Sequence, residues 1–208
     1  MLRARDLTLV YADAASEVRA VDGVSLDVKE GEFVGILGPS GSGKSSLLYL
    51  LAGLKRPVAG EVAFRDRPLA SLSDGETAAL RRKEFGFIFQ NHFLIQYLTG
   101  LENVRTGGDG ESGRLLEELR VSHCREKFPW QMSAGEKQRI AIARAMVHRP
   151  SVVFADEPTA SLDRPNAEVV MECLRRVTSG GTLFVVTHDE SILKGATRVL
   201  RMMAGRLI

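Results

Sequence analysis

One short segment constrains this chain more than any other feature. An apolar run at residues 33–37 is followed at once by Gly38-Pro39-Ser40-Gly41-Ser42-Gly43-Lys44-Ser45, which matches the pattern of a glycine, four residues and then Gly-Lys-Ser. The pattern predicts a strand, a tight turn and a helix that begins near Lys44 and ends before Gly53. In such a turn, successive backbone N–H groups curl around phosphate oxygens, and the start of the helix favours an anion.

The other residue types in this loop suit a nucleoside triphosphate. Lys44 supplies a compact positive charge for the β- and γ-phosphates, and the Ser45 hydroxyl is a hard oxygen ligand for Mg²⁺. The alternative is a serine- and glycine-rich turn that merely precedes a lysine, but it explains neither the spacing nor the flanking strand and helix. The sequence therefore predicts that the chain binds ATP with Mg²⁺ and hydrolyses it.

A second candidate part of the site follows another apolar run. Residues 152–155 are all apolar, and Asp156 and Glu157 come directly after them. The carboxyl ends of strands are where open α/β sheets bind ligands. We expect Asp156 to hold Mg²⁺, directly or through water, and Glu157 to act on the water that attacks the γ-phosphate. A solvated strand end is the alternative, and two carboxylates in tandem argue against it.

The hydrophobic pattern predicts an α/β fold. Residues 7–11 and 24–28 alternate like half-buried strands, whereas residues 152–155 and 183–186 are apolar on both faces, as in a parallel sheet covered by helices. Further strands are expected near residues 61–64, 86–90 and 199–202. Helices are expected over residues 73–82, 133–147 and 165–180, and Ser-x-x-Glu capping boxes open the first two of them.

The middle of the chain is predicted to be less regular. Thr99 and Glu102 form a further capping box, but four glycines follow between residues 107 and 113. This run favours a flexible connection that leads to a short helix near residues 114–120.

Composition and charge exclude several classes of protein. The net charge of +2 is too small for a nucleic-acid-binding surface. No apolar run reaches the roughly 20 residues of a membrane-spanning helix, and residues 1–5 lack the apolar stretch of a signal peptide. We therefore expect an intracellular, soluble chain.

The two cysteines and three of the histidines are not expected to be functional. Cys124 and Cys173 are interpreted as buried apolar residues in a reducing compartment. His92, His123 and His148 are interpreted as packed or solvated.

Residues 132–139, Met-Ser-Ala-Gly-Glu-Lys-Gln-Arg, resemble the signature motif of ABC-type ATPases, usually Leu-Ser-Gly-Gly followed by Gln or Glu. Further positions match that family in order. They are Tyr11, similar to the adenine-stacking aromatic, Gln90, similar to the Q-loop glutamine, Ser161-Leu162-Asp163, similar to the D-loop, and His188, similar to the switch histidine. The resemblance covers essentially the whole chain. Residues 85–90 and 98–104 look most like the branch that serves lipoprotein release, macrolide or antimicrobial-peptide export and cell division.

The resemblance implies an α/β P-loop NTPase fold: a mostly parallel sheet covered by helices, an N-terminal antiparallel β element and a short helical subdomain. It implies a single domain over residues 1–208, with a core of about 1–90 and 134–208 and a shortened subdomain of about 91–133. It also implies that two copies pair head to tail, with ATP between the P-loop of one and the signature of the other. Ser133 and Gly135 then touch the γ-phosphate across the interface.

The resemblance further implies which residues form the site. The nucleotide-binding set is Tyr11, Gly38, Pro39, Ser40, Gly41, Ser42, Gly43, Lys44, Ser45, Ser46, Gln90, Ser133, Gly135, Asp156 and His188. The catalytic set is Glu157, His188 and Gln90, and the Mg²⁺ ligands are Ser45, Gln90 and Asp156. Simpler interpretations stay open for single members: Tyr11 that only packs, Gln90 as a surface amide, and a Ser133/Glu136 pair that only caps a helix.

Two departures from the family pattern stand out. Ala134 replaces the first signature glycine, which is expected to alter affinity more than to abolish function. The insertion between Gln90 and Ser133 is shorter than usual, so contacts with a membrane partner transfer least well.

The function expected from the resemblance is that of an ATPase subunit. It would power separately encoded integral membrane permease subunits, or a mechanical-transmission partner, from the cytoplasmic face of the cell membrane. No nucleic-acid partner is expected. One alternative is a soluble ABC ATPase of DNA repair or translation, and another is a regulatory nucleotide-binding module with little turnover.

Overall fold

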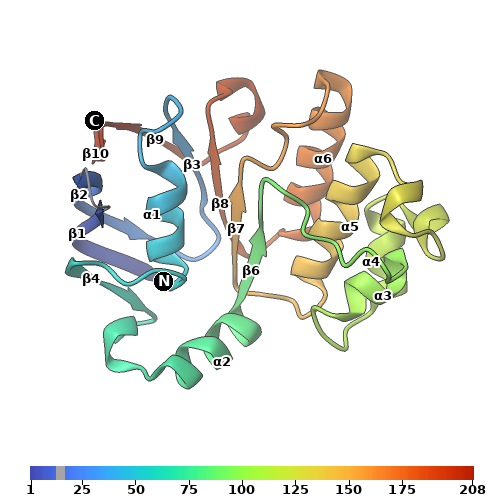
Figure 1. The fold of residues 1–208 in the computed structure, drawn as a ribbon, viewed down its shortest axis with the longest axis horizontal. Coiled ribbons are helices and arrows are strands. Elements are labelled where there is room, and N and C mark those ends of the chain that lie inside the picture. Colours follow the sequence, from blue (N-terminus) through green and yellow to red (C-terminus); the bar gives the residue numbers. More distant parts are fainter. Residues whose placement is uncertain (13–16) are drawn as a thin grey trace. The chain divides into compact units, whose positions relative to one another are not determined.

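The structure, a computed structural model, describes residues 1–12 and 17–208. By its internal contacts the chain divides into two compact units, residues 1–81 with 184–208 and residues 82–183. The larger of two sheets has the strand order β10-β9-β3-β8-β7-β6, and the division between the units falls within β8 (Thr182–Thr187) (Figure 1).

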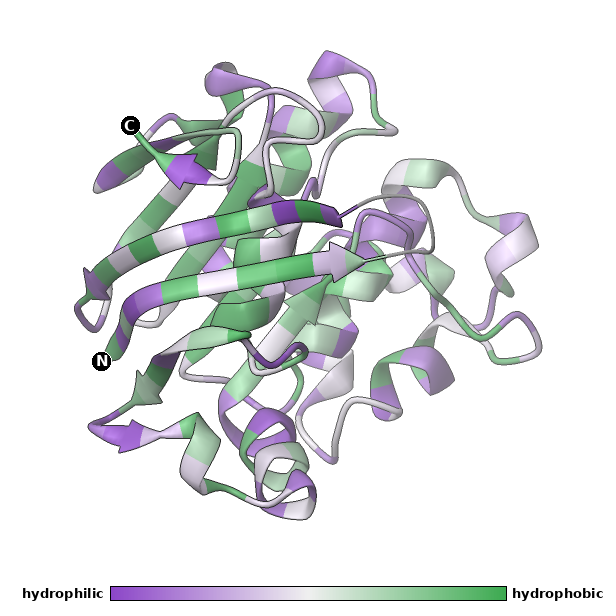
Figure 2. Ribbon diagram, turned by 60° about the vertical axis from the view of Figure 1, so that its left-hand side comes forward, coloured by the Kyte–Doolittle hydropathy of each residue, from purple (hydrophilic) through white to green (hydrophobic). Residues whose placement is uncertain are grey.

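The first unit contains a four-stranded antiparallel sheet of order β2-β1-β4-β5. Its strands are β1 (Leu2–Ala12), β2 (Glu17–Val28), β4 (Ala59–Phe64) and β5 (Arg67–Pro68). Leu2 lies opposite Val28 on one side and Phe64 on the other. Apolar and polar residues alternate along β1 and β2, as the changing colours of Figure 2 show, so one face of the sheet is buried. The predicted N-terminal antiparallel element is confirmed.

The same unit contains the strands that lead into and support the phosphate loop. All five residues of β3 (Phe33–Leu37) are buried, and the strand runs parallel to β9 (Arg198–Met203), with Leu37 opposite Arg201. A tight turn joins β9 to the antiparallel β10 (Arg206–Leu207). Three helical elements complete this region: α1 (Lys44–Leu51), η1 (Leu69–Ser71) and η4 (Glu190–Leu193), while α2 (Asp74–Glu84) spans the division.

The second unit combines a parallel strand pair with helices. Its strands are β6 (Phe85–Ile88) and β7 (Val152–Asp156), and its helical elements are α3 (Gly100–Arg105), α4 (Ser112–Glu118), η2 (Ser122–Cys124), η3 (Pro129–Gln131), α5 (Ala134–Met146) and α6 (Arg164–Val177). Helix α5 contacts α3, α4, α6 and β6, so it forms the centre of this unit (Figure 1). The predicted α/β fold of buried strands and covering helices is confirmed.

Gly107 and Gly110, which had predicted a flexible connection, pack closely against α5 instead. A Cβ atom on Gly107 would lie 2.0 Å from the Arg144 carbonyl oxygen, and one on Gly110 would lie 1.8 Å from that of Val147. Glycine is therefore required because the backbone approaches α5 too closely for any side chain. The Thr99/Glu102 box also caps a real helix, α3, and α4 begins at Ser112, before the predicted residue 114.

One predicted strand is shorter than expected. Residues 86–90 were expected to be extended, but β6 ends at Ile88, so Gln90 lies in the bend that follows. Among the described residues, no helix has the length and apolar character needed to cross a membrane.

Candidate nucleotide-binding site

The phosphate loop joins β3 to α1 as predicted. Gly43 is the N-cap residue of α1, with φ of +99°, and as a glycine it provides no side-chain cap. The first N–H groups of a helix have no partner within the helix itself. A side-chain cap normally satisfies one of them. The start of α1 therefore lacks an N-cap side chain, and its positive dipole end favours an anion.

The glycines of the loop are needed for different reasons. A Cβ atom on Gly38 would lie 2.2 Å from the Met202 carbonyl oxygen, and one on Gly43 would lie 2.0 Å from that of Ala20. At these two positions neighbouring backbone leaves no room for a side chain. Gly41 meets nothing within 4 Å, but its φ of +77° is in the left-handed region that favours glycine.

Lys44 is pre-positioned by the loop. Its side chain is nearly buried, and its Nζ donates to the carbonyl oxygens of Gly38 and Pro39, both at 2.9 Å. These two contacts hold the Lys44 ammonium group at the loop, and neither of them is made by a carboxylate. The hydroxyl of Ser42 is also buried and lacks a hydrogen-bond partner in the structure. Buried polar atoms are normally paired, so this hydroxyl is a donor that a ligand can satisfy.

The C-terminal turn supports the loop, which the sequence pattern did not indicate. The N–H of Gly205 donates to the Ser42 carbonyl oxygen at 3.0 Å, and the Gly205 carbonyl accepts from Asp22 at 2.9 Å. Arg206 forms an ion pair with Asp22, and its hydrogen bond is the main cause that lowers the pKa of that carboxyl. These contacts run from β10 to β2 beside the phosphate loop.

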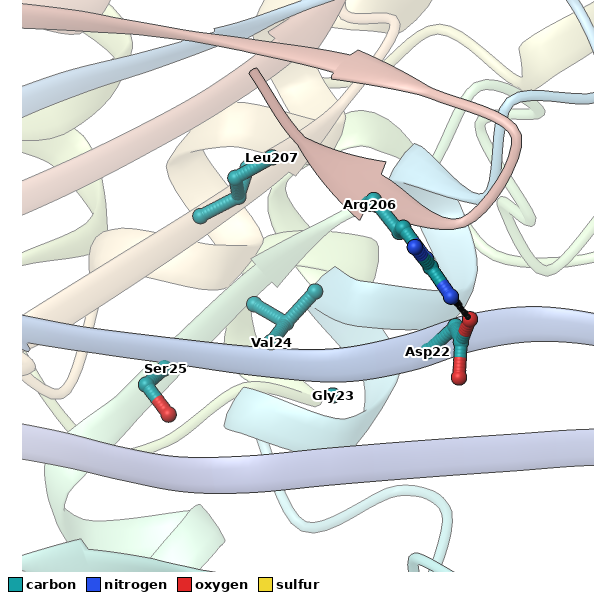
Figure 3. Close-up of a pocket in the computed structure, with 6 residues that line it drawn as sticks. All are labelled: Asp22, Gly23, Val24, Ser25, Arg206 and Leu207. Carbon is teal, nitrogen blue, oxygen red and sulfur yellow. Dashed lines mark hydrogen bonds and ion pairs between the residues drawn. The ribbon is translucent and has the colours of Figure 1, made fainter.

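A pocket of about 470 Å³ lies next to this turn. It is lined by Asp22, Gly23, Val24, Ser25, Arg206 and Leu207, and Figure 3 shows the Arg206 side chain reaching Asp22 at one end. None of the predicted nucleotide-binding residues lines it, so it is separate from the phosphate loop.

Tyr11 lies beside the first turn of α1. Its hydroxyl is 3.3 Å from the Ser46 hydroxyl, and the Nζ of Lys55 sits 5.0 Å from the centre of its ring. Tyr11 is 40% exposed, so its ring is partly open to solvent. It is therefore available for stacking, although Lys55, which no sequence motif indicated, contacts it through a cation–π interaction.

His188 follows the end of β8 within the first unit. The N–H of Gly38 donates to the carbonyl oxygen of Thr187 at 3.3 Å, so the residue before His188 touches the residue that opens the phosphate loop. His188 itself is exposed. The structure thus brings His188, Tyr11 and the phosphate loop together in one unit.

In the second unit, the parallel register aligns the acidic strand end with the Q-loop segment. Ile88 lies opposite Ala155, so Asp156, the last residue of β7, and Gln90, which follows the end of β6, lie at the carboxyl ends of neighbouring strands. Asp156 is 4% exposed, and Glu157 is half-buried with φ of +46°. A positive φ at a residue other than glycine is uncommon and often occurs at functional sites.

Two side chains that no sequence pattern indicated hold the segment after Gln90. Arg144 of α5 donates to the carbonyl oxygens of His92 and Phe93, each at 2.7 Å. Asn103 of α3 is fully buried and bonds the backbone of Ile95 and other residues of this segment at 2.8–3.1 Å. A buried amide with its hydrogen bonds filled rigidifies the loop around it.

The signature segment begins α5 as the capping box predicts. Ser133 is the N-cap, its hydroxyl accepts from the N–H of Glu136 at 3.2 Å, and its own N–H donates to the Glu136 carboxylate at 2.6 Å. Ser133 and Ala134 are exposed, and Gly135 is buried. The Ser133 side chain also hydrogen-bonds the Glu136 carboxylate, so its hydroxyl would have to exchange that partner to donate to a phosphate.

Glu136 has a second set of partners on its other side. His123 Nε2 lies 2.5 Å from Glu136 Oε1, and Lys127 Nζ lies 4.0 Å from the same oxygen. Burial raises the pKa of Glu136, but hydrogen bonds from His123 and Ser133 outweigh it and bring the pKa to about 2. Burial and the neighbouring Glu136 raise the pKa of the Cys124 thiol to about 11.

Comparison with known proteins identifies the family. Residues 21–160 match the family described as ABC transporter. The chain belongs to the ABC transporter family.

Relatives cover the whole chain. It is 39% identical over 219 residues to the lipoprotein-releasing system ATP-binding protein LolD of Myxococcus xanthus, covering 100% of this chain and 98% of that protein. It is also 39% identical to the macrolide export ATP-binding/permease protein MacB of Hyphomonas neptunium, of which it covers 34%. The predicted resemblance to this branch of the ABC family is confirmed.

Solved structures of the family have the same fold. The ATP-binding cassette MJ0796, in a dimeric post-hydrolysis state bound to ADP and Pi, has a TM-score of 0.91 and 34% identity to this chain, and the match covers 100% of this chain and 96% of that one. A second dimeric structure of MJ0796 has the same TM-score at 36% identity. The P-loop NTPase fold predicted from the motifs is confirmed.

Proposed function

We propose that this ABC-family ATPase subunit works as one half of an ATP-driven clamp, in which two copies close around ATP and hydrolysis reopens them. The chain is an ATP hydrolase that powers a membrane transporter. The observation that carries the proposal is the start of α1. There an uncapped glycine turn, the buried Lys44 and the unpartnered Ser42 hydroxyl offer several donors to phosphate.

Each predicted residue receives a role in this proposal. Gly38 to Ser46 bind the phosphates, and Tyr11 stacks on the base. Ser133 and Gly135 reach the γ-phosphate bound by the second copy. Glu157 orients and deprotonates the attacking water, while Gln90 and His188 position it and the γ-phosphate.

Mg²⁺ is the metal that the site chemistry fits. Ser45 offers a hydroxyl, Asp156 a buried carboxylate and Gln90 an amide oxygen, which are hard oxygen donors of the kind that Mg²⁺ prefers. The aligned ends of β6 and β7 support the pairing of Gln90 with Asp156. When bound, the ion neutralises charge on the phosphates.

The partners proposed are a second copy of the chain and integral membrane permease subunits. The relatives named as lipoprotein-releasing and macrolide-export proteins support such permeases, and the dimeric MJ0796 structures support the homodimer. We place the chain at the cytoplasmic face of the membrane, held there by its partners. Within it, residues 1–208 act as one ATPase domain whose helical subdomain, about 91–133, is short.

The test is the variant Glu157→Gln. Gln retains the size of the side chain and loses its basicity, so ATP binding should persist while turnover falls about 100-fold or more. The ATP-bound variant should then accumulate as a dimer, measured by sedimentation velocity with and without ATP and Mg²⁺.

Glu168→Gln is the matched control, because Glu168 is an exposed α6 carboxylate that forms an ion pair with Arg164. It should hydrolyse ATP like the wild type. Normal turnover in Glu157→Gln would remove Glu157 from the base role. A variant that binds ATP and stays monomeric would contradict the two-copy clamp.

A further inference from the structure

His123, Cys124 and Glu136 form a compact cluster in the second unit, outside the proposed nucleotide site. One ligand atom from each, an imidazole nitrogen, the thiol sulfur and a carboxylate oxygen, lies within 4.8 Å of the others. The first two residues are in η2, and Glu136 is in the first turn of α5. Two segments separated in sequence therefore bring three different metal-binding groups together.

The geometry is close to that of a bound zinc ion. With metal–ligand distances of about 2.0 to 2.3 Å, the ligand atoms of a tetrahedral site lie about 3.3 to 3.8 Å apart. The separation of 2.5 Å between His123 and Glu136 must widen and none of the others exceeds 4.8 Å, so movements of about 1 Å would bring the cluster to these separations. Nitrogen, sulfur and carboxylate oxygen are the ligand types that Zn²⁺ takes in proteins.

We propose that His123, Cys124 and Glu136 bind a zinc-class divalent cation, with water or an added ligand in the fourth position. On binding, the Cys124 thiol releases its proton to solvent and forms an Sγ–metal bond, while His123 contributes Nε2 and Glu136 one carboxylate oxygen. The thiolate and carboxylate together balance the charge of the ion. No nucleotide takes part, so the proposal stands apart from the function proposed above.

Burial and charge around the cluster allow such an ion to enter. The His123 side chain is 54% exposed, whereas Glu136 is 16% exposed and Cys124 is buried. The ion can thus approach from solvent through His123 and reach the sulfur beneath it. Lys127, 4.0 Å from Glu136, is a cation on the same oxygen, and its partly exposed, flexible chain can turn outward.

A bound ion would join two segments that now meet at the contact between His123 and Glu136. Glu136 Oε1 faces His123, while Oε2 accepts from the N–H of Ser133 at 2.6 Å. A cation on Oε1 leaves Oε2 on the backbone of the signature segment. The metal would therefore clamp η2 to the start of α5 and keep the helix cap intact.

The experiment uses the full chain without an affinity tag and without nucleotide. Titration with Co²⁺, a spectroscopic substitute for zinc, should give a thiolate-to-metal absorption band that saturates at one equivalent and is bleached by Zn²⁺. Zn²⁺ should also raise the melting temperature, because it binds the folded chain. Absence of the band in the wild type would overturn the proposal.

Three variants assign the ligands. Cys124→Ser should abolish the band, and the surface variant His123→Gln and the cap-preserving variant Glu136→Gln should each weaken binding at least 10-fold. Cys173→Ser is the matched control, because Cys173 is equally buried but lies outside the cluster, and it should bind like the wild type. If His123→Gln and Glu136→Gln bind Co²⁺ as tightly as the wild type, the metal is held elsewhere and the proposal fails. ATPase activity is not needed for any of these readouts.

Discussion

The helices α1 and α5 both begin at residues predicted to touch phosphate, yet their first turns are built in opposite ways. Helix α1 starts from Gly43, whose left-handed backbone carries no side-chain cap. Helix α5 starts from Ser133, where Ser133 and Glu136 exchange hydrogen bonds in a full capping box. One helix start has no N-cap side chain, and the other satisfies part of its donors with one.

This difference indicates which start binds phosphate by itself. An uncapped helix start gains partners when an anion arrives, whereas a capped one already has some of its donors filled and a carboxylate nearby. Glu136 places negative charge beside the signature segment. The signature is therefore expected to add contacts to a nucleotide that the phosphate loop of another copy already holds. Four variants test this comparison.

The largest effect is expected from Gly43→Ala. A Cβ atom would lie 2.0 Å from the Ala20 carbonyl oxygen in a backbone with φ of +99°, so the free energy of unfolding should fall by about 3 kcal/mol. Gly41→Ala shares the strained φ but meets nothing within 4 Å, and should lose only about 1 kcal/mol. Urea denaturation measures both. Equal losses would show that the clash with β2 does not shape the loop.

The second-largest effect is expected from Lys44→Ala, and it is an effect on ATP binding. Removing the ammonium group that Gly38 and Pro39 hold should weaken ATP binding about 100-fold, because charge-assisted contacts to phosphate are lost. Isothermal titration calorimetry gives the affinity. Lys83→Ala, at an exposed position of α2, should bind ATP normally. An unchanged affinity in Lys44→Ala would mean that the start of α1 is not the phosphate site.

The capped start of α5 predicts a pH effect. The pKa of Glu136 is lowered from its ordinary value of 4.5 to about 2, so its contribution to stability is present above the ordinary value and lost as pH falls towards 2. The wild type should lose about 1 to 2 kcal/mol more than Glu136→Gln between about pH 5 and pH 2, a figure reduced for the exposure of His123. Gln keeps the cap without the charge.

Urea denaturation at several pH values gives the free energy of unfolding of the wild type and of Glu136→Gln. The two proteins share all other carboxylates, so the difference between them reports on Glu136. If the free energies of unfolding of the two proteins changed in parallel with pH, the partners of Glu136 would not stabilise its carboxylate.

The smallest effect on stability is expected from Gly135→Ala. The backbone there is helical, and a Cβ atom would lie 3.3 Å from Asn166 Oδ1, so the gain in helix propensity and the tight contact should cancel to within about 0.5 kcal/mol. If Gly135 faces the nucleotide of a second copy, ATP turnover should nevertheless fall. Gly113→Ala, in α4 with open space around it, should leave turnover unchanged. Wild-type turnover in Gly135→Ala would contradict the signature contact.

The two helix starts also show why some features were readable from sequence. A capping box is a local pattern of two residues three apart, and the predicted boxes at Ser73, Thr99 and Ser133 all form. The phosphate loop is likewise local, and α1 begins at the predicted Lys44. Long-range contacts were not readable. The glycines at 107 and 110 suggested flexibility because nothing in their neighbourhood reveals the carbonyls of α5 against which they lie.

By itself the sequence determined the family, the phosphate loop, the order of strands and helices along the chain, and the residues to test, because each is written in short-range spacing or in periodicity. Tertiary structure alone decided what holds these parts in place. Gly205 supports the loop at Ser42, Arg144 and Asn103 hold the segment after Gln90, and Glu136 meets His123 and Cys124. These partners are far apart in the chain, and only the packing of the elements that carry them brings them together.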